Sequence, residues 1–201
     1  MKVDSTILAA LIGAIIALIA AIIPAILTIR GWRVEQRRLR EQQLWESQIE
    51  YRRQQIEELY GPLWGMVQKH KSIYEVAKKI LPNDGKKVKW DRFQGDDSDI
   101  WNFFLDNYRN PIQSEMAQLI NAKIHLLENG IMPDSFQHFL EHESVSICLY
   151  SLWKATGKSS LEKVAPNPYP EEFDRDVKSM LDQLRRDYDD LRFRQKSQKV
   201  R

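Results

Sequence analysis

The 201-residue sequence contains a single cysteine, Cys148, so no disulfide can form within the chain. Cys148 stands between Ile147 and Leu149 on a helical pattern, without the nearby base or positive charge that activates a thiol. We therefore expect Cys148 to be buried as a small apolar side chain.

The sequence also lacks an excess of charge of one sign. Its 30 lysines and arginines are balanced by 28 aspartates and glutamates, which gives a net charge of +2. No nucleic-acid-binding motif, cofactor-binding motif or internal repeat of about 20 to 50 residues is evident. We expect neither a nucleic-acid partner nor a cofactor.

Charge is missing altogether from residues 5–29, a run of 25 residues rich in Ile, Ala and Leu. At ~1.5 Å per residue, a helix of this length exceeds the ~30 Å hydrocarbon core of a bilayer. The alternative is a cleaved signal peptide, whose apolar region would be about 7 to 15 residues long and would end at small residues. This run ends in Ile29, Arg30 and Gly31 instead. The sequence therefore predicts one transmembrane anchor over residues 1–30.

Positive charge is concentrated on one side of the apolar run. Lys2 and the α-amino group precede the run, beside Asp4. Five arginines follow it: Arg30, Arg33, Arg37, Arg38 and Arg40. Because positively charged flanks are retained in the cytoplasm, we expect the N-terminus outside the cell membrane and the C-terminal region inside. The arginines are also placed to contact anionic lipid head groups, although a solvated run of charges that stops transfer explains them as well.

Small side chains recur at intervals of four residues along the predicted anchor: Ala9, Gly13, Ala17, Ala21 and Ala25. Close backbone approach over such a ridge is a main source of attraction between helices in lipid. The ridge predicts a homo-oligomer. The alternative is that it reflects only an alanine-rich composition.

A basic helical linker, residues 31–55, follows the anchor. From Trp45 onward the apolar side chains nearly follow a coiled-coil heptad, which Arg52 and His70 interrupt. Such a seam requires a partner helix, so it agrees with self-association.

Gly61 and Pro62 interrupt this helical pattern, because proline removes a backbone donor and disfavours the α conformation in the residue before it. The apolar phase continues across the two residues. We therefore predict one kinked amphipathic helix, with two separate helices as the alternative.

Residues 56–195 have the pattern of one all-α bundle, followed by a basic tail over residues 196–201. After a polar loop we expect four further helices, over residues 98–108, 112–129, 134–156 and from 171 onward. The helix over residues 134–156 is apolar all round between Ile147 and Trp153, so it should be the central one.

The stretch HFLEH, residues 138–142, matches the H-x-x-E-H pattern of inverted zinc peptidases, in which two histidines bind zinc and the glutamate acts on water. The resemblance covers five residues, and the short helical remainder has little room for the larger α/β domain of those enzymes. It implies an alternative function, a membrane-tethered metal-dependent hydrolase that uses His138, Glu141 and His142. A non-catalytic metal site that adds His125 is a further alternative, and histidines on a solvated helix flank are the simplest interpretation.

Two charges project into otherwise apolar helix faces. At about 100° per residue, Lys123 falls in the stripe of residues 112–127 and Glu143 in that of residues 136–150. The short link at residues 130–133 makes the two helices antiparallel neighbours. We predict a buried Lys123–Glu143 ion pair, since either charge alone would be costly, and a polar ligand pocket is the functional alternative.

The sequence indicates how the protein is placed more clearly than what chemistry it performs. We expect a single-pass membrane protein whose cytoplasmic bundle acts as an interaction module, in the role of a scaffold, a sensor or a membrane effector. It would act through self-association and through binding to an unidentified protein partner. No set of catalytic residues is predicted.

Overall fold

The computed structural model describes the backbone of residues 5–89, 92–157 and 168–199, and their side chains except at residues 5–27, 29, 129 and 196–199. The chain is 86% helical and the described part contains no strand, which confirms the all-α class. It divides into two units, Met1–Gln48 and Ile49–Arg201, each of which is described by itself.

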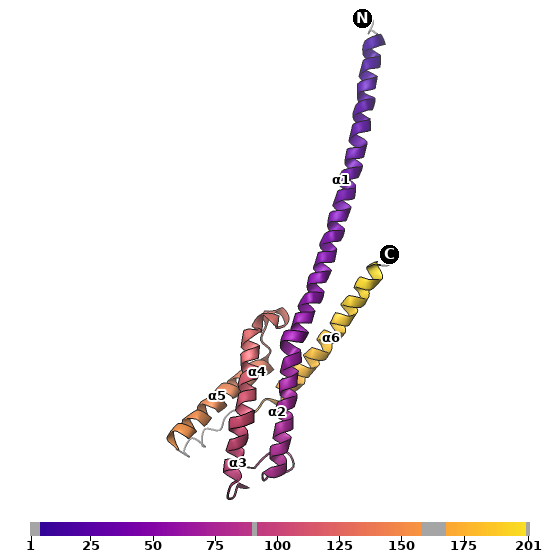
Figure 1. The fold of residues 1–201 in the computed structure, drawn as a ribbon. Coiled ribbons are helices and arrows are strands. Elements are labelled where there is room, and N and C mark those ends of the chain that lie inside the picture. The colour runs from indigo at the N-terminus through magenta and orange to yellow at the C-terminus, as the bar shows by residue number, and fades with distance from the viewer. Residues whose placement is uncertain (1–4, 90–91, 158–167, 200–201) are drawn as a thin grey trace. The chain divides into compact units, whose positions relative to one another are not determined.

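The helices follow one another with two π-helical turns between them (Figure 1). The first part of the order is α1 (Ser5–Gln54), the π-helical turn η1 (Gln55–Tyr60) and α2 (Gly61–Ile80). The second is α3 (Asp97–Phe104), the π-helical turn η3 (Leu105–Arg109) and α4 (Asn110–Ala122). Two short 3-10 turns, η4 (Ile124–Leu126) and η5 (Glu128–Gly130), then precede α5 (Asp134–Thr156) and α6 (Glu171–Lys199).

In the part of the chain that the structure describes, no helix has the length and apolar character needed to cross a membrane. The predicted anchor over residues 1–30 falls almost wholly on side chains outside the described residues, and so does its ridge of small residues. The five arginines from Arg30 to Arg40 are described, and all of them are exposed.

The helix is continuous across Gly61 and Pro62, as the apolar phase predicts. The interruption takes the form of η1, in which the Gly61 N–H donates to the carbonyl of Ile56, five residues back. The widened turn lies directly before the proline, where regular α-helical bonding is lost in any case. Glycine is required at position 61 because a Cβ atom there would lie 2.6 Å from the Ile56 carbonyl oxygen.

The sequence predicts a break at Asn110 and Pro111, but this prediction is wrong because the helix continues from α3 through η3 into α4. Proline is tolerated in the first turn of α4, where its missing N–H costs little. The extra residue in η3 changes which side chain faces inward. Tyr108 is left 39% exposed, and Arg109 is turned into the bundle.

α4 ends at Ala122, not at the predicted residue 129. Lys123 leaves the helical conformation with φ −114°, and the chain continues in η4 and η5. The free carbonyl groups of this segment are captured by side chains from the end of α1 and from η1, as described below.

The second unit contains two apolar clusters. The larger lies among η1, α2, α4, α5 and α6 and includes Leu63, Met116 and the stacked pair Phe139 and Phe173, whose ring centroids are 4.2 Å apart. The smaller lies between the end of α2, the loop that follows it and α3.

α5 begins and ends where the sequence predicts, but it is not the central helix. Its first half is buried at Phe136 and Phe139, whereas Val145 and Leu152 in its second half are 37% and 44% exposed. Figure 1 shows the second half of α5 extending away from the other helices.

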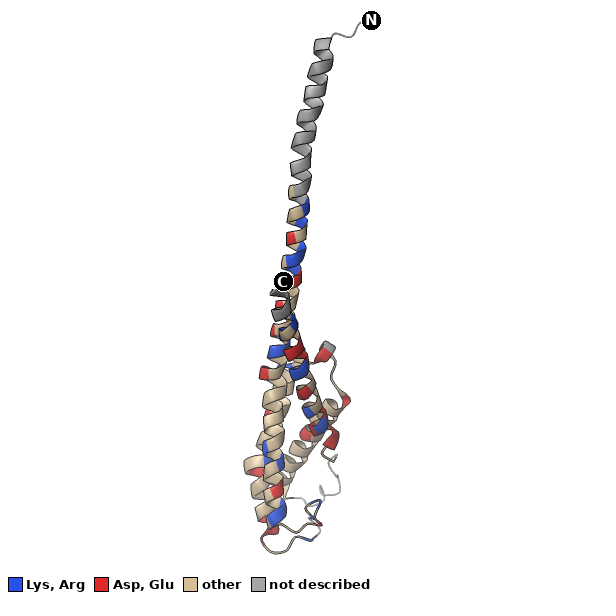
Figure 2. Cartoon of the chain, turned by 90° about the vertical axis from the view of Figure 1, so that its right-hand side faces the viewer, with Lys and Arg blue, Asp and Glu red and all other residues tan. Residues whose placement is uncertain are grey.

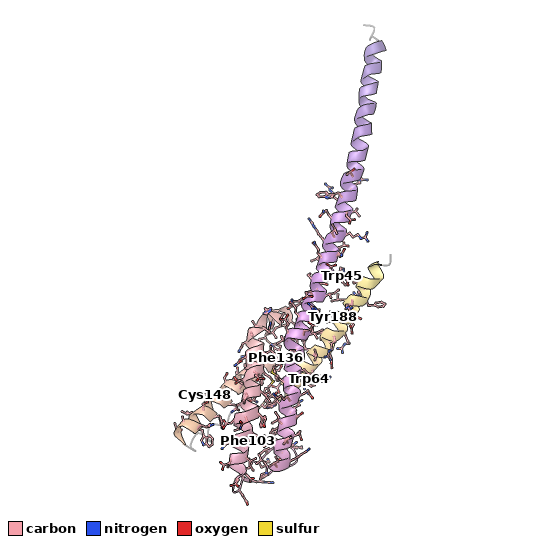
Figure 3. The ribbon with its side chains drawn as sticks, in the orientation of Figure 1. Trp45, Trp64, Phe103, Phe136, Cys148 and Tyr188 are labelled. Carbon is pink, nitrogen blue, oxygen red and sulfur yellow. The ribbon has the colours of Figure 1, made fainter. Side chains whose placement is uncertain are left out.

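Figure 3 places Cys148 on this second half of α5. Cys148 is exposed, so the expectation that it is buried is wrong. The apolar residues on either side of it, Ile147 and Leu149, are only partly buried, because this end of α5 packs against few of the described elements.

Candidate functional site

Four polar side chains from four different segments of the bundle meet inside it: His70 from α2, Arg109 from η3, Gln113 from α4 and His142 from α5. We call them the polar cluster. Gln113 and His142 are almost fully buried, His70 is 9% exposed and Arg109 is partly buried. Each lies on the inward face of its helix, so the polar cluster is part of the interior and not of the surface.

The side chains of the polar cluster lie within hydrogen-bond distance of one another. Arg109 Nη2 lies 3.3 Å from His142 Nε2, and Gln113 Nε2 lies 3.5 Å from the Nε2 atoms of His142 and of His70. A guanidinium group can only donate, so His142 Nε2 accepts from Arg109.

Tyr169 connects the polar cluster to an ion pair between the buried Asp174 and the exposed Lys71. Its ring stacks on His70 at a centroid distance of 5.1 Å and meets His142 edge-on at 5.6 Å. The Tyr169 hydroxyl donates to Asp174 Oδ1 at 2.5 Å, and Lys71 Nζ lies 2.9 Å from the other Asp174 oxygen. Asp174 is therefore already neutralised by Lys71.

Burial shifts the pKa values of these groups in the directions that disfavour charge. Burial, reinforced by Arg109, His142 and Lys71, lowers the pKa of His70 to about 4, so His70 is neutral at pH 7. Burial also lowers the pKa of Arg109, which stays charged because an arginine pKa lies far above neutrality. Burial and the nearby Asp174 carboxylate raise the pKa of Tyr169. Arg109 is the charged member of the polar cluster.

No carboxylate among the described residues forms an ion pair with Arg109. Two acidic side chains that are close to the polar cluster, through Tyr169 or in the sequence, are paired with lysines. Asp174 is paired with Lys71, and Asp106, three residues before Arg109, is paired with Lys154 at 2.8 Å. The guanidinium of Arg109 has five N–H donors, and its contact with His142 accounts for one of its nitrogen atoms.

A small cavity of about 10 Å³ lies beside Arg109, with room for about one water molecule. Only apolar surface faces this cavity, although three of the residues that line it carry polar groups elsewhere. The lining residues are His70, Ile73, Tyr74, Ala77, Trp101, Phe104, Arg109 and Ile112. The cavity lies where the two apolar clusters adjoin, since Ile112 belongs to the larger and Trp101 to the smaller.

The predicted Lys123–Glu143 ion pair is not formed, and this prediction is wrong. Lys123 Nζ pairs with Glu58 in η1 at 2.7 Å, whereas Glu143 accepts a hydrogen bond from Ser114 at 2.9 Å. Ser114 lies near the start of α4 and Lys123 just beyond its end, so the two predicted partners face opposite ends of α4. The helix projection fails at Lys123 because the helix ends one residue earlier.

The predicted metal ligands do not converge. His138 is exposed and lies 3.4 Å from Glu172, His125 is exposed on η4, and His142 is turned into the polar cluster. Within the described residues, no three His, Cys, Asp or Glu side chains are grouped as a metal site requires. The hydrolase alternative therefore has no assembled metal centre in this part of the chain.

Side chains from the end of α1 and from η1 bind the segment 123–130, which we call the connecting loop. Gln55 is fully buried and donates to the Leu126 carbonyl at 2.8 Å. Arg52 makes a two-pronged contact with Glu128, in which Nη2 lies 3.1 Å from Oε1. With the Lys123–Glu58 pair, these contacts join the start of the second unit to the connecting loop.

The sequence gives a signal for two members of the polar cluster, although it assigns His142 to a metal site instead. His70 interrupts the apolar seam of α2, which indicates a polar group that faces inward. Arg109 and Gln113 are missed because the inward register of η3 depends on its extra residue, for which Asn110–Pro111 is the only local sign. Tyr169 is missed because it lies in a connector outside any predicted helix.

Comparison with known proteins finds no matching family model, no matching characterised protein and no matching solved structure. The chemistry of the polar cluster must therefore be read from its own groups. It holds a cation, two histidines and an amide, which are groups that bind an anion or a polar ligand.

Proposed function

We propose that the protein is a membrane-anchored, self-associating helical module that presents its bundle, Ile49–Arg201, to a protein partner in the cytoplasm. The anchor is the uncharged run of residues 5–29, which is long enough to span a bilayer as a helix. The arginines that follow this run favour an N-terminus outside the cell.

The exposed apolar side chains of α1 carry this proposal. Trp32, Val34 and Leu44 are 64%, 66% and 62% exposed, and none of the described side chains between Thr28 and Gln48 is buried. Most of the stability of a helix in a folded protein comes from packing of an apolar face. A second copy of the same helix supplies such packing, and the ridge of small residues in the predicted anchor supports the same pairing within lipid. In its simplest form the assembly is a parallel dimer.

The described part of α1 carries arginines and glutamates along its length, as the blue and red segments in Figure 2 show. The exposed arginines Arg30, Arg33, Arg37, Arg38 and Arg40 precede most of the acidic residues of this helix. We assign to these arginines contact with anionic lipid head groups, each worth about 1 kcal/mol near the membrane surface.

Self-association is tested with the isolated segment 1–30 in a membrane reporter assay. Replacing Gly13 and Ala17 with Leu should reduce the reporter signal strongly, because two large side chains prevent close approach of the backbones. The matched control replaces Ile12 and Ile16 with Leu, which changes the shape of an adjacent face about 100° away and should leave the signal unchanged. Equal signals for the wild type and the Gly13→Leu, Ala17→Leu variant would contradict the proposal.

A further inference from the structure

The last helix of the second unit, α6, carries its charged residues in two blocks. Residues 171–190 hold eight acidic and four basic residues. Residues 191–201, which we call the basic end, hold five basic residues and no acidic one: Arg192, Arg194, Lys196, Lys199 and Arg201. A helix dipole favours basic residues within the last turn, but Arg192 and Arg194 lie before the last turn of α6, which ends at Lys199. The dipole therefore explains only part of this block.

Three residues of the basic end lie on one face of α6. Arg192, Lys196 and Lys199 are spaced by four and then three residues, so at about 100° per residue they fall within about 60° of one another. The backbone is helical as far as Lys199, as this alignment requires. Arg192 and Arg194 are exposed, and Phe193 between them is 73% exposed. Basic groups beside an exposed aromatic side chain are typical of helices that lie on a membrane surface.

α6 packs antiparallel to α2, as Figure 1 shows, and this places the basic end. In the first turn of α6, Asp174 pairs with Lys71 of α2 at 2.9 Å. Further along, Asp187 lies near Arg52, whose pKa is raised by its hydrogen bond to Glu128 and further by the charge of Asp187. The basic end follows Asp187. It therefore lies at the end of the second unit where the chain enters that unit.

The same end of the second unit is connected to the predicted anchor through residues 31–48. These residues belong to α1 and span ~27 Å as a helix. On the other helix, α6 continues from Asp187 to Lys199, which adds ~18 Å. A binding group on a tether of this length meets the bilayer at a high effective concentration, so weak contacts with head groups become sufficient.

We propose that the basic end of α6 is a second lipid-binding surface, which docks on anionic head groups of the bilayer that holds the anchor. The tether to this bilayer rests on the proposed function. Each lysine or arginine near an anionic surface strengthens binding by about fivefold, so the three residues on one face strengthen it by about a hundredfold.

The test uses the full chain, reconstituted in vesicles, with a polarity-sensitive fluorophore on a cysteine placed by Val200→Cys in a Cys148→Ser background. With about 30% phosphatidylserine in phosphatidylcholine, emission should shift to shorter wavelength and rise about twofold or more over phosphatidylcholine alone, because the head-group region is less polar than water. At about 0.5 M NaCl most of this difference should disappear, because salt screens exposed charges. Equal emission in the two kinds of vesicle would overturn the proposal.

A control label tests whether the response is local. Phe103→Cys, in the same Cys148→Ser background, places the fluorophore at a 55% exposed position of α3. α3 packs against the end of α2 that lies away from η1. This label should show no dependence on phosphatidylserine, and an equal response at both positions would contradict docking through the basic end.

Two sets of substitutions assign the effect to the shared face. The first set removes its three charges: Arg192→Gln, Lys196→Gln and Lys199→Gln. The matched set removes three exposed charges from the first block of α6: Arg175→Gln, Arg185→Gln and Arg186→Gln. The first set should weaken docking by about a hundredfold and remove the response, whereas the matched set should respond like the unsubstituted chain. Equal losses in the two sets would show an effect of net charge alone and would overturn the proposal.

Flotation of the same vesicles separates this proposal from the proposed anchor. A chain anchored by residues 5–29 stays on phosphatidylcholine vesicles after a wash at high salt, whereas a chain held by charge is released. Flotation without a response to phosphatidylserine at position 200 would support the anchor and overturn the lipid-binding surface. A response in a chain that the wash releases would support the surface and contradict the anchor. An equal response to soluble polyglutamate would indicate an acidic protein partner and would overturn the assignment to lipid.

Discussion

At the residue scale, the π-helical turn η1 can form only because residue 61 is a glycine. The other described glycine in α2, Gly65, has open space where a Cβ atom would be, whereas a Cβ atom on Gly61 would meet the carbonyl oxygen of Ile56. That oxygen is a backbone atom fixed by its bond to the Gly61 N–H, so it cannot move away without breaking η1.

Gly61→Ala should therefore destabilise the full chain by about 1–3 kcal/mol, in the range of substitutions that strain a special backbone position. Gly65→Ala is the matched control and should be neutral or stabilising by about 0.5–1 kcal/mol, because alanine costs less entropy than glycine in a helix. Urea unfolding in detergent followed by circular dichroism measures both. Equal losses for the two variants would contradict the role of η1.

His70 should make stability depend on pH. Its pKa is about 4 in the folded chain and about 6.5 when unfolded, so above pH 6.5 both states are neutral and His70 has no effect. As the pH falls from about 6.5 towards 4, the unfolded chain takes up a proton that the folded chain refuses, and stability decreases by about 3 kcal/mol in total.

The measurement is urea unfolding at several pH values between 4 and 7. His70→Phe keeps a flat ring against Tyr169 and should lose most of this decrease. His125→Gln, at an exposed position, should keep it. A His70→Phe variant with the pH dependence of the wild type would show that other groups cause it.

At the scale of elements, the connecting loop and η1 depend on each other. The loop leaves the helical conformation at Lys123, so its carbonyl groups need donors, and the side chain of Gln55 supplies one to Leu126. Arg52 and Lys123 add ion pairs that are partly exposed, and such pairs contribute about 1 kcal/mol or less each.

Gln55→Met should cost about 1–3 kcal/mol, because it leaves the buried carbonyl of Leu126 without its side-chain donor. The neighbouring Gln54→Met is the control. Gln54 bonds only to Glu50 on the surface, so its loss should stay within about 0.5 kcal/mol. Thermal unfolding of the two variants side by side measures the difference, and a difference near zero would show that Gln55 does not support the loop.

The elements also show what sequence patterns can predict. Helix type and position follow from apolar spacing and end signals, which is why α5 and the start of α6 agree with prediction to within a residue. The end of α4 does not, because apolar spacing continues through Leu127 while Gln55 draws the chain out of the helix after Ala122. The polar cluster depends on the register of η3, and a one-residue shift in register is invisible to a pattern with a fixed period.

At the scale of the whole molecule, Cys148 is a natural reporter of orientation because it is exposed and is the single cysteine of the sequence. If the bundle is cytoplasmic, an impermeant maleimide should label Cys148 in permeabilised cells and not in intact cells. Val3→Cys combined with Cys148→Ser should show the reverse, with labelling in intact cells. Labelling of wild-type Cys148 in intact cells would invert the proposed orientation.

The π-helical turn η1 also predicts how the sequences of evolutionary relatives should differ in this segment. It holds one residue more than an α-helical turn, so a chain that has lost that residue would form a plain α-helix through the same segment. In such a chain glycine is no longer required at position 61, and a proline at position 62 would cost about 3 kcal/mol inside a regular helix. An alignment of sequences that share this ancestry should therefore separate into two groups, one with the extra residue, the glycine and the proline together, and one without any of the three.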